Sequence, residues 1–424
     1  MQPYTTNKIA TEDFARYVSP GKVEVYRSLG FDLVPGRREG IRMWDLEGRR
    51  SWINCRSSGG VFNLGHRPKR IIDALREALK DLDIGDHILM SGQRAALARR
   101  LAQLMPGDIN YTLFGVSGGE AIDAALKLAR GYTGRPGIIS AIDGYHGHTG
   151  FALAAGADQF KSKFGPMPPG FSQVPFGDIE ALEEAVDETT AAVIFETIPA
   201  TAGIIIPPDD FFPAVRDICD RHGALLILDE VQAGLGRTGQ LWAFEEWNIV
   251  PDIVVLGKGM SAGIYPITAA CYREPLDAFF RENPFIHLSS FGGSDLGCVT
   301  AMEMLTIVSK YGFLAHVREM GRHFDAGFER LKAKYPDLVA GWRRRGLMMG
   351  LELTDDTLGP MMTYALGHNG VLAVFADFRP STLQVMPPLI IQPDEVQEVL
   401  AGFDRALGMV QEMVARGVPA PAIP

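Results

Sequence analysis

The chain has 424 residues, 46% of them hydrophobic and 22% charged, which is the composition of a globular protein of roughly two to three domains. Its formal net charge of −10 argues against a nucleic-acid-binding protein, which would need a clustered basic face. There is no apolar run long enough to span a membrane, no secretory signal at the N-terminus and no CxxC spacing among the four cysteines, so we expect a cytoplasmic protein.

The first predicted element is a hairpin over residues 41–54 with its turn at Glu47-Gly48. From about residue 70 to 300, short apolar runs alternate with segments whose apolar residues recur at helical spacing. Strands are predicted at 111–114, 137–140, 192–195, 225–228 and 253–256, and helices over 120–129 and 211–222. Buried strands joined by helical crossovers make a mainly parallel sheet.

The two ends of the chain have a different pattern of predicted elements. After about residue 310, helices mix with a strand at 348–353 and a segment containing Pro387-Pro388. We therefore predict an α/β protein with a large domain over residues 66–305. Residues 1–65 and 306–424 would together form a smaller α+β domain.

Residues that follow the predicted strands are candidates for ligand binding, because ligands of open parallel sheets bind at the carboxyl ends of the strands. Ser117-Gly118-Gly119 leads into a helix whose first N–H groups can bind an anion; the alternative is a tight turn. Tyr145 can lay its ring on a planar ligand or pack against its own loop. The nearby pair His146 and His148 lacks a third ligand pattern, so we predict no metal site.

Two acids and a lysine end the next strands. Glu196 follows the strand at 192–195, and Asp229 follows the strand at 225–228. A carboxylate in this position needs a cation or strong donors, and the choices for Asp229 are Arg237 or a protonated ring nitrogen of a cofactor. Lys258, between two glycines after 253–256, either reaches solvent or supplies an amine for a Schiff base.

One cofactor accounts for all of these features. Pyridoxal 5′-phosphate (PLP) presents a phosphate, a flat ring, a pyridine nitrogen that must stay protonated, and an aldehyde that takes a lysine. The glycine turn, the tyrosine, the aspartate and the lysine each match one of these groups.

The sequence resembles the class III (omega-type) aminotransferases, which are PLP-dependent transferases of fold type I. The matching motifs are WDLEG (44–48), NLGH (63–66), SGGEA (117–121), YHG (145–147), LDEVQ (228–232), LGK (256–258), SFGG (290–293) and PPL (387–389). The most specific feature is DEVQxGxGRTG with a lysine 29 positions after its aspartate. The resemblance implies a large domain with a mainly parallel, seven-stranded type of sheet flanked by helices.

The resemblance also implies a role for each residue at the strand ends. Lys258 would be the internal aldimine lysine, and Asp229 would pair with the pyridine nitrogen. Gln232 would bond the ring hydroxyl, and Tyr145 would stack on the ring.

The remaining implied roles concern the phosphate and the subunits. The turn made by Ser117, Gly118 and Gly119 would bind the phosphate. Glu196 matches the family's acid at the end of the preceding strand. Ser290 matches a residue that completes the phosphate site of a neighbouring subunit, which implies at least a homodimer, and a tetramer is an alternative.

The sequence departs from the family in the substrate pocket. Gln384 stands where many members have a carboxylate-binding arginine, and Thr201 stands where they have its gating glutamate. Because a neutral amide cannot make the charged bidentate contact, we expect another cation or a different oxo acid such as pyruvate. Gly59 adds room where some relatives carry a tyrosine, and Arg56 is either an alternative carboxylate contact or a surface residue.

We therefore predict an aminotransferase that moves an amino group from a primary amine or amino acid to an oxo acid by a ping-pong mechanism. A PLP-dependent aminomutase, racemase or decarboxylase on the same scaffold is the alternative. The pattern Gly234-x-Gly236-x-x-Gly239 raises a remote alternative, an NAD(P)-dependent dehydrogenase, but five residues separate it from the preceding strand.

Overall fold

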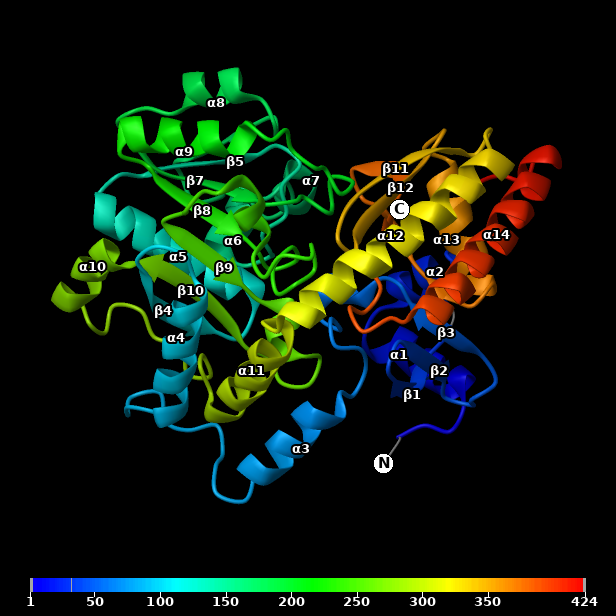
Figure 1. Cartoon of the computed structure of the whole chain (residues 1–424), viewed down its shortest axis with the longest axis horizontal. Helices are drawn as coiled ribbons and strands as arrows, with labels where there is room; N and C mark the ends of the chain where they lie inside the picture. Colours follow the sequence, from blue (N-terminus) through cyan, green and yellow to red (C-terminus); the bar gives the residue numbers. More distant parts are fainter. Residues whose placement is uncertain (1–2, 32, 422–424) are drawn as a thin grey trace. The chain divides into compact units, whose positions relative to one another are not determined.

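The structure is a computed structural model that describes residues 3–31 and 33–421 (Figure 1). The chain forms two compact units. The larger unit contains Lys69–Thr201 and Ile205–Leu314, and the smaller one contains the chain up to Pro68, Ala202–Ile204 and the chain from Ala315. The sequence predicted domain changes after residues 65 and 305 and did not separate residues 202–204 from the large domain.

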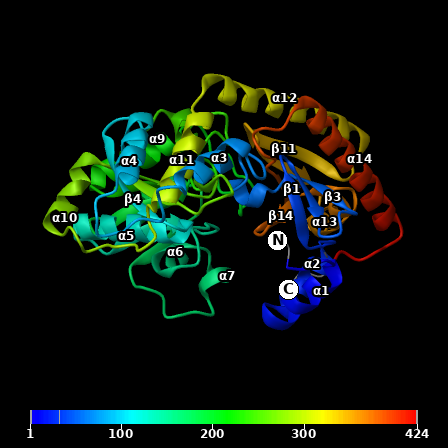
Figure 2. The same ribbon diagram turned by 90° about the horizontal axis from the view of Figure 1, so that it is seen from below.

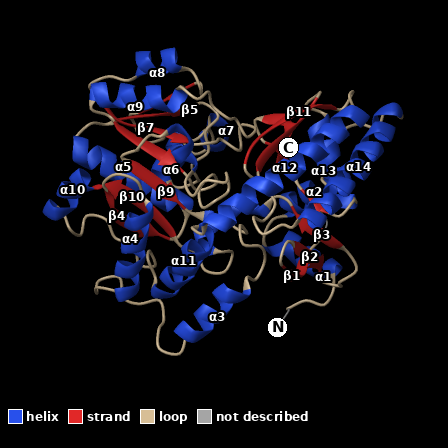
Figure 3. Ribbon diagram, viewed as in Figure 1, coloured by secondary structure: helices blue, strands red, loops and turns tan. Residues whose placement is uncertain are grey.

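The larger unit is built on a seven-stranded sheet with the order β4-β10-β9-β8-β7-β5-β6. Its strands are β4 (Ile109–Gly115), β5 (Gly137–Ala141), β6 (Phe171–Val174), β7 (Thr190–Glu196), β8 (Leu225–Asp229), β9 (Ile253–Leu256) and β10 (Thr268–Arg273). Strand β10 runs antiparallel to both of its neighbours, whereas β5 to β9 pair in parallel. The predicted mainly parallel sheet is confirmed, and Figure 3 shows its strands in red among flanking helices.

Two strands of this sheet were missed in the sequence. Strand β6 (FSQV) has two polar residues at its centre and so no apolar run, and β10 contains two alanines, which are weak strand formers. The five predicted strands lie within β4, β5, β7, β8 and β9.

Helices and 3-10 turns connect the strands of the larger unit. They are α3 (Lys69–Ala78), α4 (Gly92–Leu104), α5 (Gly118–Thr133), α6 (Gly150–Ala155), α7 (Asp158–Lys161), α8 (Ile179–Ala185), α9 (Phe211–His222), η2 (Ala243–Trp247), η3 (Lys258–Ser261), η4 (Glu274–Leu276), α10 (Asp277–Glu282) and α11 (Asp295–Val308). Helix α12 (Tyr311–Lys334) continues from this unit into the smaller one.

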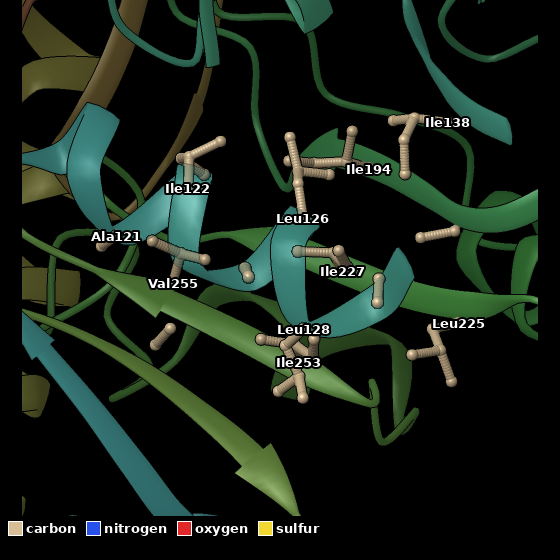
Figure 4. Packing of buried hydrophobic residues seen from close by; sticks show 14 of the residues in the cluster. Ala121, Ile122, Leu126, Leu128, Ile138, Ile194, Leu225, Ile227, Ile253 and Val255 are labelled. Atoms are coloured by element: carbon tan, nitrogen blue, oxygen red, sulfur yellow. The ribbon is translucent and has the colours of Figure 1, made fainter. Parts of the chain in front are cut away.

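Helix α5 forms the centre of the core of the larger unit. The Ser117 hydroxyl accepts a hydrogen bond from the backbone N–H of Glu120 and starts the helix, and Gly134, with φ of 67°, ends it. Between these ends, Ile122 and Leu126 belong to a buried apolar cluster with residues of the central strands (Figure 4). Burial of each large aliphatic side chain contributes about 1.5 to 3 kcal/mol, so packing fixes α5 against the sheet.

The smaller unit contains two four-stranded sheets, with the orders β1-β2-β3-β13 and β11-β12-β15-β14. Their strands are β1 (Pro35–Glu39), β2 (Arg42–Asp45), β3 (Ser51–Asn54), β11 (Val339–Arg345), β12 (Met348–Leu353), β13 (Val371–Leu372), β14 (Val374–Ala376) and β15 (Arg379–Val385). Strands β2 and β3 pair in antiparallel fashion, and the N–H of Gly48 donates to the carbonyl of Asp45 in the turn. The predicted hairpin over residues 41–54 is therefore confirmed.

The other elements of the smaller unit are α1 (Asn7–Tyr17), α2 (Pro20–Ser28), η1 (Ser57–Gly60), α13 (Leu358–His368) and α14 (Pro393–Ala415). Helices α12 and α14 lie side by side, as Figures 1 and 2 show, and the rings of Phe328 and Phe403 meet between them at 6.1 Å. In the described residues no single helix is long and apolar enough to cross a membrane. Helices α11 and α12 reach that length and hydropathy only when taken together, and the chain bends by 69° between them.

A buried histidine supports the turn η1. Asn54 Nδ2 donates to Nε2 of His66 over 3.1 Å, and Asn54 Oδ1 accepts from the backbone N–H of Ser57. Because only a neutral imidazole can accept this bond, the contact requires uncharged His66. Burial lowers the pKa of His66 to about 4, and Arg38 adds to the effect.

This contact predicts a specific loss of stability in acid. The unfolded chain binds a proton on His66 below about pH 6.5, whereas the folded chain does so only near pH 4. The stabilisation is thus complete above pH 6.5 and is lost as the pH falls toward 4, by on the order of 2 kcal/mol. The substitution His66→Gln introduces a side chain that does not titrate. The denaturant midpoint of this variant should therefore fall less between pH 7.5 and pH 4.5 than that of the wild type. An identical loss in both proteins would contradict this role.

Candidate active site

The carboxyl ends of the parallel strands surround one cavity in the larger unit, with a volume of about 360 Å³. Eight of the nine predicted cofactor-binding residues line it: Ser117, Gly118, Gly119, Tyr145, Glu196, Asp229, Gln232 and Lys258. Ser290, the ninth, is not among the lining residues, and the resemblance assigned it to a neighbouring subunit. Residues up to 141 positions apart in the sequence thus meet at one place.

One wall of the cavity is the start of α5. The hydroxyl of Ser117 binds the N–H of Glu120, whereas the first N–H groups of a helix, those of Gly118 and Gly119, have no intrahelical acceptor. These N–H groups lie at the positive end of the helix dipole and can bind an anion.

Close packing explains the glycines of this wall. A Cβ on Gly119 would lie 2.6 Å from the hydroxyl oxygen of Thr149, and a Cβ on Gly147 would lie 2.8 Å from Cα of Gly119. Gly147 also has a φ of 125°, in the region that favours glycine. We call the anion-binding turn at Gly118 and Gly119 the glycine cradle. It depends on two backbone segments that can approach each other closely because Gly119 and Gly147 have no side chains.

Asp229, at the end of β8, is buried and oriented by a histidine. Its Oδ2 lies 2.9 Å from Nδ1 of His146, and its Oδ1 accepts from the backbone N–H of Val231. Since a carboxylate only accepts, Nδ1 carries the proton of this bond. Nε2 of His146 is buried and has no hydrogen-bond partner among the described residues.

The sequence predicts no role for His146 in this site. With His148 it suggests only a metal-binding pair, for which a third ligand pattern is lacking. The contact joins two loops 83 residues apart in the sequence. The available signal was its place next to Tyr145, at the end of a strand that the parallel topology brings near Asp229.

Glu196 and Tyr145 are joined by a hydrogen bond. Oε1 of Glu196, at the end of β7, accepts from the backbone N–H of Tyr145 over 3.0 Å. Burial raises the pKa of Glu196 to about 7. The ring of Tyr145 meets those of His148 and Phe160 edge-on, each at 5.4 Å between centroids, so both the backbone and the ring of Tyr145 are held.

Lys258 lies at the start of η3 with a strained backbone. Its φ of 37° is in the left-handed region, which is unfavourable for a residue with a side chain. The hydroxyl of Ser261 donates to the carbonyl oxygen of Lys258 over 2.6 Å and supports this conformation. Strain of this kind is common where a reactive side chain must be aimed in one direction.

The four substrate-pocket candidates do not line the cavity. Thr201 is buried in the segment after β7 of the larger unit. In the smaller unit, Gln384 lies on β15 between Gly350 and Val374, and Gly59 has a left-handed backbone in η1. Arg56 is exposed.

The basic run at 343–345 has a structural role in the smaller unit. Arg343 pairs with Glu352 and donates to the carbonyls of Gly203 and Ile204. Arg344 pairs with Asp325.

The segment Gly234–Gly239 forms a series of turns and not a nucleotide-binding motif. The described chain opens no helix at Gly239, and the next regular element is η2. The element after these turns, η2, is held next to β8 by Glu230, whose carboxyl group accepts from the N–H groups of Ala243 and Phe244 and from the hydroxyl of Thr197. This geometry removes the support for a dehydrogenase.

Known proteins match the chain over most of its length. Residues 27–407 match the family described as Aminotransferase class-III. An uncharacterized aminotransferase of Archaeoglobus fulgidus is 52% identical over 406 residues, which are 95% of each chain.

Solved structures agree with this match. The ornithine aminotransferase of Toxoplasma gondii ME49 has a TM-score of 0.88 at 27% identity, over 97% of each chain. The (S)-enantioselective omega-transaminase of Thermomicrobium roseum has a TM-score of 0.87 at 27% identity, over 96% of this chain and 100% of its own. The fold is thus that of the PLP-dependent aminotransferases. With the family match and the 52% identity, this chain belongs to the class III aminotransferases and is an enzyme of that family.

Proposed function

We propose that the protein uses PLP to move an amino group from a primary amine or amino acid to an oxo acid in a ping-pong reaction. The observation that carries the proposal is that Lys258, Asp229 and the glycine cradle line one cavity. A structure of the related Toxoplasma gondii enzyme has PLP at partial occupancy in its active site.

The chemistry of the lining residues fits this cofactor. Gly118 and Gly119 would hold the phosphate through their N–H groups, and Tyr145 would cover the ring. Asp229 would bind the ring nitrogen, and Gln232 the ring hydroxyl. When bound, PLP supplies an aldehyde for an amine and a ring that delocalises the electron pair of a bond broken at the substrate Cα.

Two residues of the chain would handle protons. Nζ of Lys258 would hold the cofactor covalently at rest and, once the substrate amine displaces it, take the proton from Cα and return it at C4′. The carboxylate of Asp229 would keep the ring nitrogen protonated. The bond from His146 Nδ1 orients that carboxylate.

Names of the structural relatives guide the choice of substrates. The relatives include an ornithine aminotransferase, an acetylornithine aminotransferase and an omega-transaminase. Donors with a terminal amino group are therefore the first to test. Because Gln384 lacks the charge of an arginine, pyruvate and 2-oxoglutarate should be compared as acceptors.

We also propose that the enzyme is a homodimer. The larger unit exposes apolar side chains from two segments, with Ile88 69%, Leu89 66%, Phe285 71% and Phe291 59% exposed. The segments are neighbours, because the N–H of Asp295 donates to the carbonyl of Ile84. Several exposed apolar side chains of this kind are typical of subunit interfaces, and the exposed Ser290 lies between Phe285 and Phe291 in the chain.

Replacement of the lysine tests the covalent role. Lys258→Ala should still bind PLP, but without the covalent bond, and should lose activity by roughly 10² to 10⁴-fold, the range for a general acid–base group. Absorption spectra and amino-transfer assays measure both effects. The exposed Lys163, changed to alanine, is the matched control and should behave as wild type. Normal multiple-turnover activity of Lys258→Ala would refute the assignment.

Replacement of the aspartate tests the charge at the ring nitrogen. Asp229→Asn keeps the size of the side chain but not its charge, so most of the PLP affinity should remain while kcat falls about 10² to 10³-fold. The substitution His146→Gln, which leaves the Asp229 carboxylate in place, should lower kcat by a smaller factor. A rate near wild type for Asp229→Asn would mean that the ring nitrogen is not held protonated by this residue.

Light scattering tests the homodimer. The wild-type protein should have twice the mass of one chain, and the double substitution Ile88→Asp with Phe285→Asp should give monomers that bind PLP more weakly. Val414→Asp, which charges an exposed apolar site on α14, should leave the mass unchanged. A monomeric wild type with full PLP affinity would exclude a role for a neighbouring subunit.

A further inference from the structure

Two buried carboxyl groups stand side by side at the edge of the sheet. Glu196 and Asp229 are paired residues in the parallel ladder of β7 and β8, so their strands lie about 4.8 Å apart. Glu196 is 6% exposed and Asp229 is 5% exposed, and both line the cavity. Two negative charges so close together in a site with little water would repel each other strongly.

The hydrogen bonds of the two carboxyl groups differ. Asp229 accepts from the imidazole of His146 and from the N–H of Val231, so both of its oxygens have donors. Glu196 accepts from one backbone N–H, that of Tyr145. The bond that Glu196 makes needs only an acceptor oxygen, which both the charged and the neutral carboxyl group supply.

The groups that face Glu196 act on its pKa in both directions. Burial, the largest influence, and the neighbouring Asp229 raise the pKa, whereas His146, the Tyr145 N–H and Lys258 lower it. The net result is a pKa of about 7, so the charge of Glu196 is easily lost. A neutral carboxyl group can still accept the Tyr145 N–H through its carbonyl oxygen.

The two carboxyl groups together hold one dipeptide. Glu196 binds the backbone of Tyr145, and Asp229 binds the ring of the next residue, His146. The flanking Gly144 and Gly147 allow a tight loop, in which Gly147 has a left-handed backbone. The position of Tyr145 on the cavity wall thus depends on the bond from its backbone N–H to Glu196 as well as on the contacts of its ring.

We propose that Glu196 is a positioning residue: its carboxyl group fixes Tyr145 against the cofactor through the backbone N–H bond and does not need its negative charge to do so. This inference rests on the proposed function, because it takes PLP as the occupant of the cavity. It gives the buried acid a task distinct from charge pairing with the cofactor.

Titration of the apoprotein with PLP tests the inference without an activity assay. Glu196→Gln is neutral and keeps an acceptor for the Tyr145 N–H, so its Kd should stay within about threefold of wild type. Glu196→Ala loses one hydrogen bond, and its Kd should rise roughly tenfold. The visible circular dichroism of PLP-saturated protein, which reports how the ring is held, should match wild type in the glutamine variant and be weaker in the alanine variant.

Two results would overturn the inference. A glutamine variant with tenfold weaker binding would show that the ionised carboxylate is needed, and this comparison decides even where the alanine variant does not fold. An alanine variant with wild-type Kd and dichroism would show that Tyr145 is positioned without Glu196. Wild-type protein that binds no PLP would instead refute the proposed function, so the two failures can be told apart.

Discussion

The buried hydrogen bond between Asp229 and His146 is the contact on which the architecture of the site depends. A carboxylate at the end of an apolar strand is stable only when donors replace the lost water. Here the donors are one imidazole and one backbone N–H, and the imidazole comes from the loop that also carries Tyr145. The hydrogen bond that His146 donates to the Asp229 carboxylate therefore also fixes the loop of Tyr145, which forms another wall of the cavity.

The rest of the site is built on the same principle of fixed backbone. The cradle at Gly118 and Gly119 uses the N–H groups of a helix that the apolar core holds against the sheet. Lys258 keeps a left-handed backbone with the help of Ser261. When a pocket is already ordered, the binding of its ligand loses less free energy to ordering of the protein. This rigidity supports the proposed use of PLP, whose ring must be held in one orientation.

Much of this site could be predicted from the sequence, because parallel strands bring residues at their carboxyl ends together regardless of their separation in the chain. Apolar runs indicate five of the seven strands, and the polar residues that follow them, such as Asp229 and Lys258, are the candidates. The hydrogen bond from His146 to Asp229 could not be predicted, since it depends on the conformation of two loops. For the same reason, the bond from Tyr145 to Glu196 was visible only in three dimensions. Strand β10 was missed because its alanines pack well in a crowded sheet but give little local preference for a strand.

The central claim is that Lys258 is the residue that holds PLP covalently. Reduction of the purified, PLP-loaded protein with borohydride, followed by peptide mass mapping, tests it most directly, because reduction makes the bond permanent. The account predicts one phosphopyridoxyl group per chain, on the peptide that contains Lys258. A label on a different lysine, or a PLP-saturated protein that carries no label after reduction, would contradict it.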